Sequence, residues 1–102
     1  MTAALSPSEI SAALADLAGW SGNEHGIQGA WRFADFPAAI AFMSSCVDAI
    51  EGMQHHPEWS NVYNRLTITL KTHDAGDRVT AKDIELASTL NARLAAAGAQ
   101  VA

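Results

Sequence analysis

The sequence predicts a single α+β domain with the element order αββαββα, in which three helices cover one face of the sheet. Apolar residues recur at helical spacing in three segments, and they alternate with polar residues, as in strands, in the segments between. Some connections between the predicted strands are long enough to hold a helix, whereas the other strands are close enough in the sequence to form hairpins. The length of 102 residues is close to the commonest domain size, so we expect residues 1–102 to share one core.

Each of the three predicted helices has a recognisable start. Ser6-Pro7-Ser8-Glu9 has the pattern of a capping box with proline at the first helical position. Asp35 can cap a second helix, which cannot continue through Pro57. Thr80-Ala81-Lys82-Asp83 is a second capping box that opens the last helix. The apolar stripes of the three helices are Ile10, Leu14 and Leu17, then Ile40, Met43, Val47 and Ile50, then Ile84, Ala87, Leu90 and Leu94.

Four strands are predicted between these helices. Trp20 opens the first, and the second alternates its large apolar side chains from Ile27 to Phe33. A long third strand with one buried face is expected from Trp59 to Thr72, and Val79 is expected to add a short fourth strand. The buried face of the third strand would carry Val62, Leu66, Ile68 and Leu70, and its second face Trp59, Tyr63, Arg65, Thr67, Thr69 and Lys71.

Charge and cysteine content exclude several classes of function. The net charge is −5, and the six Lys and Arg residues are scattered singly, so we expect no direct nucleic-acid binding. The lone Cys46 excludes an internal disulfide and a cysteine zinc site. The start, MTAALSPSEI, lacks the features of a signal peptide, and no apolar run approaches the roughly 20 residues that span a bilayer. We therefore expect a cytoplasmic protein without membrane contact.

Three histidines fall at positions that folding could bring together. His55 and His56 lie in the turn between the second helix and the long strand, and His73 lies just past the far end of that strand. Neutral imidazole donates through one nitrogen and accepts through the other, and its unperturbed pKa is about 6.5. Such groups can remove one proton and supply another at neutral pH, as elimination of water requires. Glu51, four residues before His55, could orient that ring.

Structural explanations exist for the same residues. A His-His pair before a proline is also typical of a polar turn, and a histidine such as His73 is typical of a solvated strand end. Asp83 is explained as a helix cap, and Trp59 as a residue that packs on the sheet. Three histidines and a glutamate could also bind zinc. However, the side chains of adjacent residues diverge by about 100° on a helix and about 180° on a strand, so we expect no metal site.

The spacing of these residues resembles the signature of the pterin-4a-carbinolamine dehydratase family. The signature residues Glu51, His55-His56-Pro57, Tyr63, His73 and Asp83 occur at fixed intervals. HHPEW at 55–59 and NVYN at 61–64 are similar to the central block of the family, RFADF at 32–36 to its entry into the second helix, and DIELA at 83–87 to its last helix. The resemblance extends from about Trp20 to Asn91.

The resemblance implies a specific activity and fold. Family members dehydrate 4a-hydroxytetrahydropterins to quinonoid dihydropterins without a metal or other cofactor, and they form dimers or tetramers. Their fold is a four-stranded antiparallel sheet with helices on one face. An alternative role is that of a non-catalytic interaction protein, because some relatives are dimerisation partners of a transcription factor and others assist assembly of a carbon-fixing enzyme.

The resemblance also assigns roles to residues of this chain. The catalytic histidines correspond to His55, His56 and His73, with Glu51 and Asp83 as supporting acids. His55 and His73 are expected to be the proton donor and acceptor, and His56 to contact the substrate. Either Phe36 or Trp59 is expected to pack against the flat pterin ring.

Overall fold

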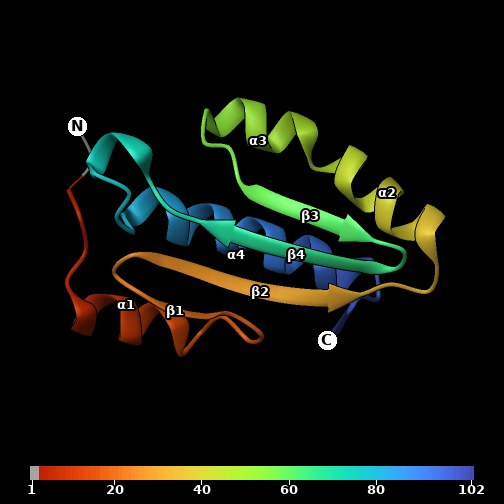
Figure 1. Ribbon diagram of the computed structural model, residues 1–102, viewed down its shortest axis with the longest axis horizontal. Helices are drawn as coiled ribbons and strands as arrows, with labels where there is room; N and C mark the ends of the chain where they lie inside the picture. The colour runs from red at the N-terminus through yellow and green to blue at the C-terminus, as the bar shows by residue number, and fades with distance from the viewer. Residues whose placement is uncertain (1–2) are drawn as a thin grey trace.

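A computed structural model describes residues 3–102 and shows an antiparallel sheet covered on one face by helices (Figure 1). Strands β1 (Ser21–Asn23), β2 (Gly26–Arg32), β4 (Arg65–Leu70) and β3 (Glu58–Val62) lie in that spatial order, and each pair is antiparallel. A two-residue strand, β5 (Gln100–Val101), pairs with the end of β2. The predicted α+β class and the antiparallel sheet are confirmed.

The helices begin where the capping residues predict. In α1 (Pro7–Leu14) the side chains of Ser6 and Glu9 form the reciprocal bonds of a capping box. Asp35 accepts a hydrogen bond from the Ala38 amide at the start of α2 (Phe36–Ser45), and Thr80 caps α4 (Ala81–Ala96). The predicted second helix is divided, because α2 ends at Cys46, from which α3 (Val47–Met53) begins. A short 3-10 turn, η1 (His73–Ala75), follows β4.

The prediction of one long strand over 59–72 is wrong, because the chain turns back at residues 63–64. Val62 pairs with Arg65, and Tyr63 adopts a left-handed conformation with a φ of 53°. The Asn61 side chain donates to the carbonyls of Tyr63 and Arg65, at 3.0 Å each, and thereby fixes the turn. The result is the hairpin β3–β4.

A two-residue turn places the residues that flank it on the same face of the sheet, so it reverses the alternation assumed for a continuous strand. Val62 therefore lies opposite Arg65 and is 73% exposed, whereas Trp59 pairs with Ile68 on the covered face. Both residues lie on the face opposite to the predicted one. The predicted fourth strand at Val79 is also absent from the described residues, where the chain forms only isolated bridges between Thr72 and Arg78 and between Ala4 and Thr80.

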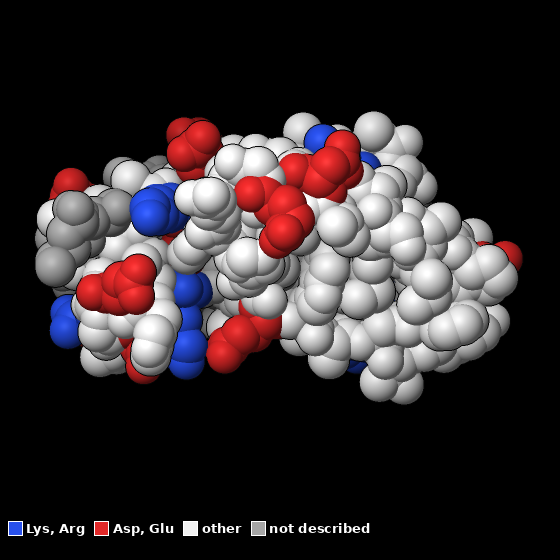
Figure 2. All heavy atoms as spheres, turned by 90° about the horizontal axis from the view of Figure 1, so that it is seen from above, with Lys and Arg blue, Asp and Glu red and all other residues white. Residues whose placement is uncertain are grey.

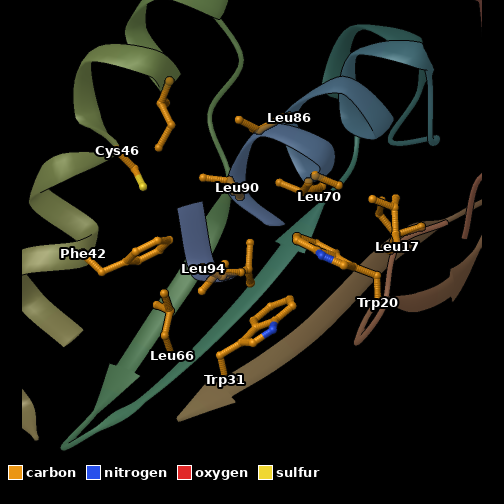
Figure 3. Packing of buried hydrophobic residues seen from close by; sticks show 14 of the residues in the cluster. Leu17, Trp20, Trp31, Phe42, Cys46, Leu66, Leu70, Leu86, Leu90 and Leu94 are labelled. Carbon is orange, nitrogen blue, oxygen red and sulfur yellow. The ribbon is translucent and has the colours of Figure 1, made fainter. Parts of the chain in front are cut away.

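The core lies between the sheet and the helices (Figure 3). Leu86, Leu90 and Leu94 of α4 point toward the covered face of the sheet. Burial of each such side chain contributes about 1.5–3 kcal/mol. The other face of the sheet carries partly exposed residues, such as Thr67 and Thr69 of β4. The strand residues buried in the core are Ile27, Trp31, Leu66, Ile68 and Leu70.

Helices α2 and α3 together have the length and apolar composition of a membrane-crossing segment. The segment Phe36–Met53 has a mean hydropathy of 1.2. However, it is broken at Cys46, and Ala39, Phe42 and Ile50 pack into the core of the domain. Packing against the sheet accounts for only part of its apolar character, because 22% of the segment is buried and Phe36, Ile40 and Val47 are exposed.

Candidate active site

The three histidines of the motif meet at one end of the sheet. Glu58 at the start of β3 pairs with Thr69 near the end of β4, so the turn before β3 lies beside the segment after β4. Gln54 ends α3 in a left-handed conformation and turns the chain toward the sheet. A cleft of about 240 Å³ lies there and is lined by Gln54, His55, His56, Lys71, Thr72, His73, Asp74 and Lys82.

His55 is the buried member of the group. It is 8% exposed, and its Nε2 lies 2.6 Å from Oδ1 of Asp83, which is fully buried. The second oxygen of Asp83 accepts hydrogen bonds from the Thr72 hydroxyl, at 2.8 Å, and from the Thr80 amide, at 2.9 Å. Asp83 therefore caps α4 and holds His55 with the same carboxylate.

His56 is exposed and is oriented by Glu51. Its Nε2 lies 2.5 Å from Oε2 of Glu51, and about two-thirds of each side chain is open to solvent. We predicted that Glu51 would orient His55, and this is wrong. The prediction assumed that helical spacing persists to residue 55, but α3 ends at Met53 and the left-handed Gln54 redirects the chain.

His73 lies at the open rim of the cleft on η1. Its Nδ1 lies 3.0 Å from Oδ1 of Asp77, one i,i+4 step along the chain. The hydrogen bond that His73 donates to Asp77 raises the pKa of His73, and the negative charges of Asp77 and Asp74 raise it further. More of His73 is therefore protonated near neutral pH than of an ordinary histidine.

The two aromatic residues expected to contact substrate lie in different places. Trp59 lines a smaller hollow of about 180 Å³ beside His56, together with Val47, Ile50, Glu51 and Pro57. Phe36 begins α2, four residues after the end of β2 and near the β3–β4 turn, at the opposite end of the sheet from the cleft (Figure 1). The fold therefore places Trp59, but not Phe36, beside the histidines of the same chain.

Several residues of the site were not singled out in the sequence. Asp77 was taken as part of a turn, although its i,i+4 spacing from His73 was a usable signal. Thr72 was taken as a strand residue and Thr80 only as a helix cap, because their contact with each other depends on the tertiary fold. Lys71 and Lys82 bring positive charge to the cleft, and Figure 2 shows blue and red side chains side by side at this end of the molecule.

Within residues 3–102 no cluster of three or more His, Cys, Asp or Glu side chains has an arrangement suited to a metal ion. Each of the three imidazoles is instead paired through one nitrogen with a different carboxylate. No other hydrogen bond engages the second nitrogen of these rings among the described side chains. The arrangement can therefore accept and donate protons at several points around one cleft.

The fold and the site together define a class of protein: a small α+β domain with a histidine-lined cleft. The chain belongs to the family described as pterin 4 alpha carbinolamine dehydratase, whose model matches residues 3–93. The family resemblance seen in the motif spacing is confirmed.

Relatives and a solved structure agree with this assignment. A protein of Solibacter usitatus provisionally named pterin-4-alpha-carbinolamine dehydratase is 50% identical over 92 residues, which cover 90% of this chain and 96% of the relative. A protein of Opitutus terrae with the same provisional name is 44% identical over 87 residues, or 85% of this chain and 90% of the relative. The crystal structure of a transcriptional coactivator/pterin dehydratase from Brucella melitensis matches with a TM-score of 0.82 and 40% identity, covering 87% of this chain and 96% of that chain.

Proposed function

We propose that the protein is a lyase that dehydrates 4a-hydroxytetrahydropterins to quinonoid dihydropterins and water. The observation that carries the proposal is the placement of three imidazoles around one cleft, each paired with its own carboxylate. The reaction needs a proton acceptor and a proton donor at two neighbouring atoms of the substrate. Membership of the dehydratase family supports the same reaction.

The two proton transfers of the reaction are divided between His55 and His73, and His56 contacts the substrate. One imidazole accepts the proton of N5, and the electrons of that N–H bond form the C4a–N5 double bond. The bond between C4a and its hydroxyl breaks, and the other imidazole protonates the departing oxygen, which leaves as water. General acid–base catalysis of this kind contributes about 10²–10⁴-fold. Neither a metal nor another cofactor has a role in this scheme.

The remaining residues orient the imidazoles and receive the substrate. Asp83 holds His55 from the buried side, Glu51 holds His56, and Trp59 offers an aromatic side chain beside His56. We propose that Trp59 packs against one edge of the pterin. Phe36 has no such role in the cleft of its own chain, because it lies at the other end of the sheet.

The proposal is tested by an absorbance assay with freshly generated 4a-hydroxytetrahydropterin. Addition of the protein should accelerate the loss of the substrate absorbance, and the double variant His55→Ala/His73→Ala should lose that acceleration. His25→Ala is the matched control, because His25 is an exposed residue of the β1–β2 turn and does not line the cleft. An unchanged rate in the double variant would remove both histidines from the mechanism.

We also propose that the protein forms a homodimer or homotetramer. Phe36, Ile40 and Val47 of α2 and α3 are 47%, 39% and 52% exposed, and α2 contains no charged residue. Figure 2 shows a largely uncharged surface toward the α2 end of this face. Exposed apolar side chains in a stripe are typical of an interface. Light scattering should give a multiple of the 10.8 kDa chain mass, and Ile40→Glu should lower it.

A second candidate function is that of an interaction protein without a need for catalysis. The similar Brucella melitensis protein is described as a transcriptional coactivator as well as a pterin dehydratase, which favours a test of both roles. A partner that co-purifies equally well with the His55→Ala/His73→Ala variant would support this function. The scattered basic residues argue against direct nucleic-acid binding. The buried, free Cys46 suits a reducing compartment, and we place the protein in the cytoplasm.

A further inference from the structure

Behind His55 lies a buried group of polar side chains whose hydrogen atoms can be assigned one by one. Its members are Asp83, Thr72 and Thr80, all of them buried. The hydroxyl of Thr72 donates to Oδ2 of Asp83 at 2.8 Å, so its single hydrogen is committed. The hydroxyls of Thr72 and Thr80 lie 2.6 Å apart, and Thr80 must therefore be the donor of that pair.

The same accounting fixes the role of Asp83. Its Oδ2 accepts from the Thr72 hydroxyl and from the Thr80 amide, and both bonds favour the ionised carboxylate. Its Oδ1 faces Nε2 of His55 at 2.6 Å. A carboxylate can only accept hydrogen bonds, so Nε2 of a neutral His55 has to carry the hydrogen.

The other nitrogen of His55 is directed differently. Among the described residues, the buried polar side-chain atoms without a partner are Trp20 Nε1 and Arg78 Nε. Nδ1 of His55 forms no hydrogen bond with the described residues and is not one of these sealed atoms, so it keeps contact with the cleft that His55 lines. With its hydrogen on Nε2, the neutral ring presents a lone pair at Nδ1.

We infer that Thr72 and Thr80 are positioning residues that lock His55 in the Nε2–H tautomer, which makes Nδ1 of His55 the proton acceptor of the site. His73, on the solvent side of the cleft, is then the donor. In the reaction, Nδ1 takes the N5 proton, His73 protonates the departing hydroxyl, and exchange with water restores both rings. The catalytic assignment rests on the proposed function, whereas the tautomer does not.

The tautomer is tested directly by NMR of the intact protein with ¹⁵N-labelled histidine. Long-range proton–nitrogen correlation spectra are recorded at alkaline pH, and the His55 signals are identified by their loss in His55→Gln. The expected result is a protonated Nε2 and an unprotonated Nδ1. The reverse pattern, or an equal mixture of tautomers in the unaltered protein, would overturn the inference without any reference to activity.

Variants of Thr72 then test the positioning role. Thr72→Val keeps the shape but removes the donor, and it should lower kcat by about ten- to a hundredfold with little change in KM, the range for one hydrogen bond to a charged group. Thr72→Ser retains the hydroxyl and should restore both kcat and the Nε2–H pattern. The matched control is Thr67→Val, on the open face of β4, the strand that ends two residues before Thr72.

The kinetic outcomes separate the two proposals. Equal kcat values for Thr72→Val and the unaltered enzyme, or equal losses in Thr72→Val and Thr72→Ser, would overturn the positioning role. Absence of dehydratase activity in the unaltered protein would instead refute the proposed function. The tautomer of His55 would then still be decided by the NMR spectrum alone. If Thr72→Val does not fold, the spectrum of the unaltered protein still decides whether the lock exists.

Discussion

The Nε2 atom of His56 lies 2.5 Å from a carboxylate oxygen of Glu51, across the left-handed residue that ends α3. Both side chains are about two-thirds exposed, so the pair is screened by solvent and contributes little to stability. Its effect is to orient the imidazole of His56, which lines both the cleft and the hollow beside Trp59.

Replacement of Glu51 should therefore affect activity more than stability. Glu51→Gln is expected to lower kcat/KM several-fold while changing the free energy of unfolding by less than about 0.5 kcal/mol. Steady-state kinetics and urea denaturation of the same preparation measure the two quantities. Glu85→Gln, an exposed change on α4, should alter neither. A loss of stability comparable to that of a core variant would contradict this account.

The pKa of His73 predicts how activity depends on pH. Asp77 and Asp74 raise this pKa, while Lys71 opposes them. His73 should remain protonated to a higher pH than an ordinary histidine. If His73 is the proton donor, kcat should therefore decline only at a pH above the range in which an ordinary histidine loses its proton. Asp77→Asn should move this alkaline limb of the kcat profile to lower pH. An NMR titration of His73 should shift in parallel, and Asp16→Asn is the control. A limb that stays in place in Asp77→Asn would exclude His73 as its source.

The same shift has a defined effect on stability. The folded pKa of His73 lies above the unfolded value, so folding favours the protonated form. The resulting stabilisation is complete below the unfolded pKa and is lost as pH rises through the folded pKa. In Asp77→Asn this pH dependence should diminish, which urea titrations at a series of pH values would detect.

Removal of the Asp83 carboxylate should be costly to the fold as well as to the site. Asp83→Ala leaves His55, Thr72 and the Thr80 amide without their buried acceptor. Loss of one partner from a buried charged group costs about 3–5 kcal/mol. Urea denaturation measures this change, and Glu85→Ala on the exposed side of α4 should stay within about 0.5 kcal/mol. A cost near that of Glu85→Ala would show that the buried network contributes little.

Two glycines should respond in opposite directions to the same substitution. A Cβ at Gly29 would lie 2.5 Å from Cη2 of Trp31 and 2.6 Å from the Gly19 carbonyl oxygen, so Gly29→Ala should destabilise by about 1–3 kcal/mol. Gly52 lies in α3 with nothing within 4 Å of its Cβ position. Gly52→Ala should stabilise by about 0.5–1 kcal/mol, the difference between glycine and alanine in a helix. Thermal unfolding of both variants checks the two signs.

The sequence predicted the elements whose signals are local. The caps at Ser6, Asp35 and Thr80 mark the starts of α1, α2 and α4, because a cap depends only on the next three residues. The hairpin at Tyr63 was missed because its turn residue is not glycine and Val62 continued the apolar alternation. The break at Cys46 was also missed, because the apolar stripe continues across it.

The site was predicted in part for the same reason. Motif spacing identified His55, His56, His73 and Asp83, and the fold brings these residues to one end of the sheet. The partners of the histidines are less accessible to sequence reasoning. Glu51 was matched to the wrong ring, since the outcome depended on the backbone conformation of Gln54. The contact of Thr72 with Thr80 depends on how β4 and α4 meet.

The carboxylate of Asp83 starts α4 and also anchors His55, so one side chain serves local folding and the chemistry of the cleft. Docking of the last helix and completion of the proton-transfer site should therefore be a single event during folding. An unfolding intermediate that retains the cleft but has lost α4 should not exist. Substitutions that destabilise the start of α4 should therefore alter the orientation of the His55 imidazole even when they do not contact it.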